Sequence, residues 1–367
     1  MANRAGFIRR PNASYAPGSG DIYVSPRIIA PHNLRTGDEV CGQIGQQNHR
    51  GKSPPLRYVH TVNGHSLEEL NPRREFDKLS ARHPDRPLKL ECELERGPHD
   101  YTNRIIDIFC PLGLGQRALI VAPAKAGKTM VLQAIAEGIA KNYPDYKLLI
   151  LLVDERPEEV TEMEMTGFGE VAASSFDFPA DRHVKVAQMT LERGRRLAEM
   201  GQNVVVILDS ITRLARAHNT LCGGSGRTLT GGLDSESLEK PKRFFGSARN
   251  IAPDQGGGSL TIIATALVDT GSRMDQVIFE EFKGTGNSEL VLSRELADRR
   301  IYPAIDLNSS ATRKEELLLD PDALAVARAM RRELSSYPPM EAMGEVLGLM
   351  RKTESNEEMI ATLRRRV

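Results

Sequence analysis

The sequence predicts a small N-terminal β-barrel followed by an α/β domain that is built on a mostly parallel sheet. Three observations lead to this prediction. Short β-type runs broken by turn residues fill residues 1–60, and apolar runs of strand length alternate with helical segments from about residue 105 onward. A loop of phosphate-binding type links the first of these later strands to a helix.

Composition narrows the class of protein. The chain has 367 residues, of which 40% are hydrophobic and 27% are charged, which is typical of a globular protein of two or three domains. No apolar run approaches the roughly 20 residues needed to span a bilayer, and no secretion signal opens the chain. The four cysteines form no CxxC pair. We therefore expect a cytoplasmic protein with reduced thiols and no membrane partner.

The predicted N-terminal domain covers residues 1–70. Its β-type runs lie at 6–8, 21–24, 39–42 and 57–59. Basic and acidic residues balance at 49 each over the chain, but residues 1–60 hold eight basic residues against three acidic ones. A small barrel of this kind has the OB or cold-shock pattern of proteins that bind single-stranded nucleic acid.

Aromatic residues interleave with arginine in this segment, at Phe7, Arg9, Tyr23, Arg57 and Tyr58. Bases stack on aromatic side chains while a basic groove follows the nucleic-acid backbone, so the pattern favours a single-strand binding surface. The alternative is that Phe7 and the tyrosines form the core of the barrel.

Residues 71–104 are rich in proline and charge and are expected to form a connector. Residues 105–367 are expected to form one α/β domain. The predicted strands are 118–122, 147–153, 204–208 and 260–265, whose near-continuous Leu, Ile and Val runs fit a parallel sheet that is buried on both faces.

The strongest local motif is the loop Ala122-Pro-Ala-Lys-Ala-Gly127-Lys128-Thr129, which lies between a predicted strand and a predicted helix. Such a loop presents backbone N–H groups and a helix N-terminus to an anion. Lys128 is then expected to reach the β- and γ-phosphates of a nucleotide, and Thr129 to hold Mg²⁺. Ala122 stands where the motif has its first glycine, and a chance turn is the alternative.

Two acidic residues follow buried strands. Asp209 comes directly after the predicted strand 204–208 and has the position of a Walker B aspartate. Glu155 follows the strand 147–153 and is the candidate for polarising an attacking water. The alternative is that such acids cap the next helix, which suits Glu158 and Glu159 better.

Phosphoryl transfer also needs positive charge at the transition state. Arg300 and Arg313 are the candidates, with a solvated surface arginine as the alternative. Glycine-rich loops at 221–232 and 269–275 each carry one basic residue, Arg227 and Arg273. If the domains form a ring, both loops could grip a nucleic-acid backbone in its pore, whereas an idle surface loop is the alternative.

Nine stretches together resemble the Rho family of bacterial transcription termination factors over essentially the whole chain. They are 21–26 (DIYVSP), 33–38 (NLRTGD), 115–117 (GQR), 123–129 (PAKAGKT), 154–163 (DERPEEVTEM), 208–216 (LDSITRLAR), 240–246 (KPKRFFG), 280–287 (EEFKGTGN) and 312–318 (TRKEELL). The resemblance implies a RecA-like, hexameric, ATP-dependent and Mg²⁺-dependent 5′-to-3′ RNA translocase and helicase. It also implies single-stranded, pyrimidine-rich RNA and the RNA polymerase elongation complex with its elongation factors as partners.

The resemblance also implies residue roles at the nucleotide. Glu155 would be the catalytic carboxylate, Asp209 the Walker B acid and Arg313 the arginine finger, with Arg300 and Lys283 also reaching a neighbouring subunit's nucleotide. The nucleotide contacts would be Gly113, Leu114, Gly115, Gln116, Arg117, Ala118, Lys125, Ala126, Gly127, Lys128, Thr129, Met130 and Arg156, with Tyr302 stacking on adenine.

For RNA the resemblance implies a primary site on the barrel and a secondary site in the pore. The primary site would comprise Phe7, Arg9, Asp21, Ile22, Tyr23, Leu56, Arg57 and Tyr58. The secondary site would comprise Arg227 and Arg273. Leu56 stands where the family typically has an acidic residue that bonds a pyrimidine edge, so discrimination at that base should weaken while stacking remains.

Two other classes of protein compete with this interpretation. One is another RecA-type ring, such as a rotary ATPase subunit or a DNA recombinase, against which the basic aromatic barrel and the two loops argue. The other is an RNA-binding protein that uses ATP only as an assembly switch, against which Glu155 and Arg313 argue.

Overall fold

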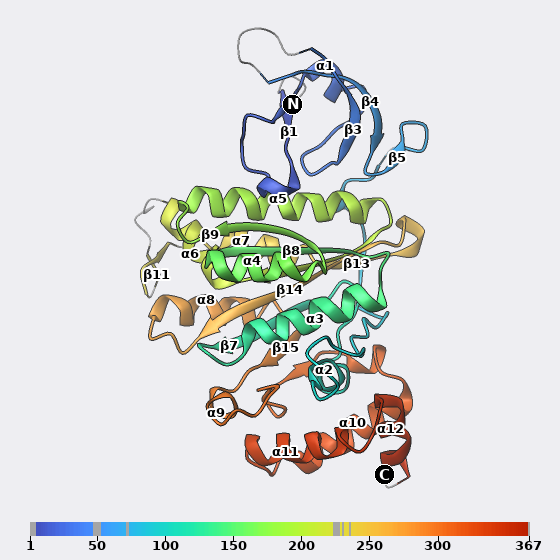
Figure 1. Cartoon of the computed structure of the whole chain (residues 1–367), viewed down its shortest axis with the longest axis vertical. Coiled ribbons are helices and arrows are strands. Elements are labelled where there is room, and N and C mark those ends of the chain that lie inside the picture. Colours follow the sequence, from blue (N-terminus) through green and yellow to red (C-terminus); the bar gives the residue numbers. More distant parts are fainter. Residues whose placement is uncertain are drawn as a thin grey trace.

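The computed structural model describes residues 5–46, 53–70, 73–222, 231–234 and 236–365, together with the backbone of 228–229. These residues form an N-terminal β-domain that lies over one side of a larger α/β domain, followed by a C-terminal group of helices on the other side (Figure 1). Among the described residues, no helix is both long and apolar enough to cross a membrane.

In the described part of the N-terminal β-domain, five strands form two small sheets. They are β1 Gly6–Ile8, β2 Ile22–Val24, β3 Val40–Ile44, β4 Leu56–Val62 and β5 His65–Ser66. β1 pairs with β2, β3 pairs with β4 and β4 with β5, and a bridge between Tyr23 and Pro55 connects the two sheets. The four β-type runs expected from sequence are all strands. Their core is the set Val24, Leu56, Val59 and Val62.

The main sheet has nine strands, and its path runs in the order β16-β15-β7-β14-β10-β8-β9, with β13 and β6 off this path. The strands are β6 Ala81–Arg82, β7 Arg117–Pro123, β8 Lys147–Glu155, β9 Glu170–Ser175, β10 Asn203–Asp209, β13 Arg249–Ile251, β14 Ser259–Val268, β15 Ser288–Val291 and β16 Ala311–Thr312. The six strands from β15 to β9 along this path are mutually parallel. The four strands predicted from sequence are confirmed as its four central members.

Helices cover both faces of this sheet. They are α2 Thr102–Phe109, α3 Lys128–Asn142, α4 Pro157–Thr166, α5 Ala180–Glu199, α6 Ile211–Leu221, α7 Glu239–Gly246, α8 Arg273–Lys283, α9 Arg294–Asp298, α10 Pro321–Leu334, α11 Pro339–Met350 and α12 Asn356–Arg364. The small elements are α1 Pro26–Ile29, the hairpin β11 Thr228–Leu229 with β12 Leu233–Asp234, and the 3₁₀ turns η1 Pro11–Ala13, η2 Phe76–Lys78, η3 Pro253–Gln255 and η4 Glu315–Leu317.

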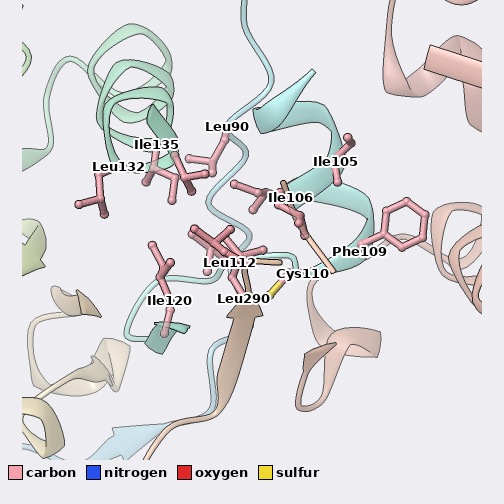
Figure 2. Close-up of a cluster of buried hydrophobic side chains, with 14 of the residues drawn as sticks. Leu90, Ile105, Ile106, Phe109, Cys110, Leu112, Ile120, Leu132, Ile135 and Leu290 are labelled. Carbon is pink, nitrogen blue, oxygen red and sulfur yellow. The ribbon is translucent and has the colours of Figure 1, made fainter. Parts of the chain in front are cut away.

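Side chains along β7 alternate between two hydrophobic cores. Ala118, Ile120 and Ala122 pack with α2, α3 and the C-terminal helices, whereas Leu119 and Val121 pack with α5, α6 and α8. Figure 2 shows the first core, in which Leu90 of the connector lies among side chains of α2 and α3. The connector is therefore part of the core of the α/β domain, because its buried leucines pack against the sheet and against side chains of α2 and α3.

Polar contacts join the N-terminal β-domain to α5 and β9. The Arg35 guanidinium lies 2.5 Å from the Glu199 carboxylate at the end of α5, and that carboxylate also accepts a bond from the Phe76 backbone N–H. The Tyr15 hydroxyl donates to Glu170 of β9, and the Ser14 hydroxyl accepts from the Ala173 N–H at 2.9 Å. The β-domain thus rests on the strand and helix that lie at one margin of the sheet.

Truncation of Leu90 to alanine should lower the free energy of unfolding by about 2–5 kcal/mol, because its fully buried side chain would leave a cavity. Urea denaturation followed by circular dichroism measures this loss. Leu317→Ala is the control, because Leu317 is 41% exposed and the same change should stay within about 0.5 kcal/mol there. Equal losses for the two variants would contradict the placement of the connector in the core.

Candidate functional site

The loop between β7 and α3 has the backbone shape of an anion cradle. β7 ends at Pro123, α3 begins at Lys128, and Gly127 caps the helix with φ of +85°. Lys125 also has a positive φ of +63°. These left-handed residues turn the chain so that the first N–H groups of α3 face the space beyond the sheet edge. Ala126 is buried, whereas Lys125 and Met130 are exposed and Thr129 is half-buried.

The Lys128 ammonium lies between two carboxylates at the carboxyl ends of neighbouring strands. Its Nζ is 3.0 Å from Oε1 of Glu155 on β8 and 2.6 Å from Oδ1 of Asp209 on β10. The Thr265 hydroxyl on β14 donates to the same Asp209 oxygen at 2.7 Å. Parallel pairing of β14, β10 and β8 brings these groups to one edge of the sheet, as expected from sequence.

Burial and charge shift the protonation of this cluster. Burial raises the pKa of Glu155, the Asp209 carboxylate adds to the rise, and Lys128 and Arg213 offset part of it. Burial alone would lower the pKa of Lys128, but Asp209 and Glu155 together raise it. The lysine therefore stays charged, and Glu155 is poised as a base of higher proton affinity than an ordinary glutamate.

Arg213 is a member of this cluster that the sequence argument did not single out. Its Nη1 donates to Asp154 at 3.0 Å, and its Nε lies 3.3 Å from Oε1 of Glu155. Arg213 stands four residues after Asp209, on the first turn of α6. Its short distance in sequence from a strand-end acid is the signal that could have identified it as part of the site. Arg156, by contrast, is exposed, and its Nε lies 4.0 Å from Glu159.

A cavity of about 250 Å³ opens beside the loop and α3. Its lining residues are Arg96, His99, Asp100, Thr102, Gly127, Met130, Val131, Tyr302, Pro303 and Ala304. A Cβ on Gly127 would lie 3.3 Å from the Tyr302 ring, so this aromatic face borders the loop directly. The structure brings Tyr302 and Met130 together as expected. It adds Arg96, His99 and Thr102, which lie in or next to the connector and carried no motif.

The residues Gly113 to Ala118, which we expect to line the approach to a nucleotide, do not border the loop of their own chain. These residues lead into the start of β7, whereas the loop follows its end, about 20 Å away at the usual rise of a strand. Gly113, Leu114, Gly115, Gln116 and Ala118 are buried. Gln116 uses its amide to donate to Asn287, and a Cβ on Gly115 would meet the Asn250 backbone at 2.2 Å. Within one protomer these residues pack against the sheet.

The basic residues expected to act between subunits lie at two ends of the sheet. Arg313 follows β16 beside the start of β7, where burial lowers the pKa of Arg117 and the charge of Arg313 lowers it further. Lys283 ends α8 near the start of β15. Both are exposed and far from the loop of their own chain. Arg300, also exposed, precedes Tyr302 by two residues on the loop side.

An exposed aromatic surface lies on the N-terminal β-domain. Phe7 is 50% exposed and packs edge-on against Tyr23 at 5.8 Å between ring centroids, and Tyr58 is 64% exposed. Arg57 is exposed beside Tyr58. The Phe7 and Tyr58 rings are thus not the core of this domain, and the alternative interpretation of them is wrong.

Three other residues of the predicted primary site face inward or are paired. Leu56 is 4% exposed and belongs to the core of the domain, so its side chain cannot present an edge to a base. Ile22 packs against the same core. Asp21 is buried and lies 3.5 Å from Arg9, so it orients that guanidinium.

Gly231 of the first glycine-rich loop lies against the start of α8. A Cβ on Gly231, in the β11–β12 turn, would be 2.9 Å from the Met274 N–H and 3.0 Å from the Arg273 carbonyl carbon. Arg273 is the first residue of α8 rather than part of the loop before it, because Ser272 caps that helix by accepting from the Asp275 N–H. Arg227 lies outside the described residues.

Comparisons with known proteins agree with both parts of the chain. Residues 1–68 match the RNA-binding domain of Rho termination factor, and residues 102–312 match the nucleotide-binding domain of the ATP synthase alpha/beta family. A solved ATPase from the type III secretion system of pathogenic bacteria aligns with 87% of this chain and 92% of its own, with a TM-score of 0.63 and 23% identity. That likeness shows the shared RecA-like fold.

Two curated relatives are transcription termination factors Rho. The one from Gemmatimonas aurantiaca is 55% identical over 97% of this chain, which spans 48% of that relative's length. The one from Cereibacter sphaeroides is 50% identical over 98% of this chain and 84% of its own length. The chain therefore belongs to the Rho transcription termination factor family.

Proposed function

We propose that this chain is a transcription termination factor that couples ATP hydrolysis to 5′-to-3′ movement along single-stranded RNA. The observation that carries the proposal is the Lys128 ammonium held between Glu155 and Asp209, directly behind an anion-binding loop. The exposed aromatic and basic surface on the β-domain of the same chain supplies a place for RNA. Family membership supports the joining of these two activities in one protein.

In this proposal ATP occupies the loop, with adenine in the cavity against Tyr302. Lys128 turns from the two carboxylates to the β- and γ-phosphates, with Lys125, Arg156 and the N–H groups of α3 as further contacts. Glu155 accepts a proton from the attacking water, which its raised pKa favours. Arg213 holds Glu155 in place at 3.3 Å.

The residues present suit Mg²⁺. Thr129, which follows Lys128 in the chain, and Asp209, which lies 2.6 Å from the Lys128 ammonium, offer hard oxygen donors, and Mg²⁺ prefers one or two such groups together with phosphate oxygens and water. Within the described residues no cluster of three or more His, Cys, Asp or Glu could hold a metal by itself. Bound Mg²⁺ would neutralise charge that develops on the phosphates.

The positions of Arg313 and Lys283 support a ring, which we take to be a homohexamer. Both lie at the end of the sheet opposite the loop of their own chain, so they can serve only a neighbour's nucleotide. Arg313 is the proposed arginine finger. Arg300 is exposed near its own loop and is proposed to reach across the same interface.

RNA is proposed to bind at two places. Phe7, Tyr23 and Tyr58 stack on bases of a pyrimidine-rich strand, with Arg9 and Arg57 on its backbone. Arg273, together with Arg227, contacts RNA in the pore. With Leu56 buried, base discrimination at that position is weak.

The cellular partners would be the RNA polymerase elongation complex and its elongation factors in the cytoplasm. A rotary subunit would not need the aromatic surface, and an assembly switch would not need the Glu155 geometry.

Glu155→Gln should keep ATP binding and lower kcat by about 10²-fold or more, because the amide cannot accept a proton. Phosphate release with saturating RNA measures turnover, and a fluorescent ATP analogue measures binding. Glu158→Gln is the matched control, since that carboxyl is exposed on the first turn of α4. Turnover of Glu155→Gln near that of the control would remove Glu155 from its role.

Arg313→Ala and Glu155→Gln should each be inactive alone but recover ATPase activity when their subunits are mixed. In a mixed ring, some interfaces combine the intact Glu155 of one subunit with the intact Arg313 of its neighbour. Exposed Arg332→Ala, on α10, is the control that stays active throughout. A mixture as inactive as its components would contradict a site shared between subunits.

Phe7→Ala and Tyr58→Ala should each weaken binding of oligo-pyrimidine RNA about 5–150-fold, the effect of about 1–3 kcal/mol per stacked base. Fluorescence anisotropy measures this loss. Wild-type affinity should fall with salt at a log–log slope of about −0.7 per phosphate contact.

Tyr337→Ala is the control for this loss. Tyr337 is 37% exposed and lies outside the β-domain, so the variant should bind RNA as wild type does. The same RNA should stimulate wild-type ATPase activity, whereas duplex DNA should not. Equal stimulation by both polymers would favour another class of ring ATPase.

A further inference from the structure

A buried histidine on α5 faces the catalytic cluster without belonging to it. His183 is 6% exposed. Its Nδ1 lies 2.7 Å from the Ser174 hydroxyl on β9, and its Nε2 lies 4.0 Å from Oδ1 of Asp154. The imidazole therefore bridges β9 and the end of β8, one residue before Glu155.

The chemistry of these partners selects one tautomer. The Asp154 carboxylate lies beyond hydrogen-bond distance of Nε2, and its negative charge favours the tautomer that carries a hydrogen on Nε2, in which Nδ1 accepts from the Ser174 hydroxyl. Burial lowers the pKa of His183, Arg182 and Arg213 lower it further, and Asp154 and Asp181 oppose them. The ring is thus neutral at pH 7.

The residue types are those of a nucleophilic triad, but the arrangement is not. Ser174 has no exposed surface and donates to the imidazole, so no substrate can reach its oxygen. Instead, Ser174 contacts His183, and His183 in turn contacts Asp154.

Asp154 in turn holds the group that contacts Glu155. It has a positive φ of +58°, which a non-glycine residue keeps only where its surroundings hold it. Its carboxylate accepts from Arg213 at 3.0 Å, and Arg213 Nε lies 3.3 Å from Glu155. A shift of Asp154 would therefore move Arg213 and, through it, the proposed base.

We propose that His183 is a positioning residue of the ATPase site, which holds the Asp154 carboxylate and thereby sets the Arg213 contact to Glu155. This inference rests on the proposed function, because ATP turnover is its readout.

The test compares two substitutions of His183, each of which keeps a polar nitrogen at the place of only one of the two imidazole nitrogens. The amide nitrogen of glutamine reaches the place of Nε2, whereas asparagine ends at the place of Nδ1 and cannot reach Asp154. His183→Asn should lower RNA-stimulated kcat about tenfold or more at unchanged KM for ATP, and His183→Gln should stay within about threefold of wild type. Ser174→Ala, which removes the donor to Nδ1, should lower kcat by about threefold.

Val186→Ala is the matched control for loss of stability, since Val186 lies one turn further along α5 in the hydrophobic core. It should lower Tm while kcat stays at the wild-type value. In an Asp154→Ala background, His183→Asn should cause no further fall in kcat, because both changes remove the same contact.

Wild-type kcat in both His183→Asn and Ser174→Ala would overturn the inference. Losses of kcat that parallel losses of Tm in every variant, Val186→Ala included, would also overturn it. So would additive losses of kcat in the Asp154→Ala background. Wild-type protein without RNA-stimulated ATPase activity would instead count against the proposed function.

Discussion

A single buried ammonium between two carboxylates is the interaction on which the site depends. Lys128 comes from the helix after β7, and Glu155 and Asp209 come from the ends of β8 and β10. Removing one partner from a buried pair costs about 3–5 kcal/mol, so these three elements are held together at the edge of the sheet. A triphosphate that attracts Lys128 would leave two acids in need of another cation, which is the position that Mg²⁺ suits.

The parallel sheet also separates the chemistry into two ends. The anion loop, Glu155 and Asp209 lie where the strands finish, whereas Arg313 and Lys283 lie where they begin. Because β7 alone spans about 20 Å, no side chain bridges that distance within one chain. In the proposed ring, a neighbouring subunit would therefore complete the site, and ATP turnover would depend on assembly.

The N-terminal β-domain rests on the same part of the sheet that supports Glu155, the proposed base. Ser14 and Tyr15 bind β9, and β9 carries Ser174, which contacts His183. Arg35 binds Glu199 at the far end of α5, the helix that holds His183. The surface proposed for RNA and the cluster around Glu155 therefore share β9 and α5 as their support.

Local pattern determined much of this protein. The phosphate loop, the four central strands and the strand-end acids Glu155 and Asp209 follow from apolar runs and from the order of residue types along the chain. β9 and β15 escaped prediction because neither has an apolar run: β9 mixes polar with small residues, and β15 has only four residues, of which two are polar. The tertiary structure alone decided what lies near what. It placed Gly113 to Ala118 at the opposite end of β7 from the loop, buried Leu56, and brought Arg213 and His99 to the site. The physical reason is that periodicity reports which face of an element is buried, whereas proximity between distant segments depends on strand order and on packing across the whole sheet.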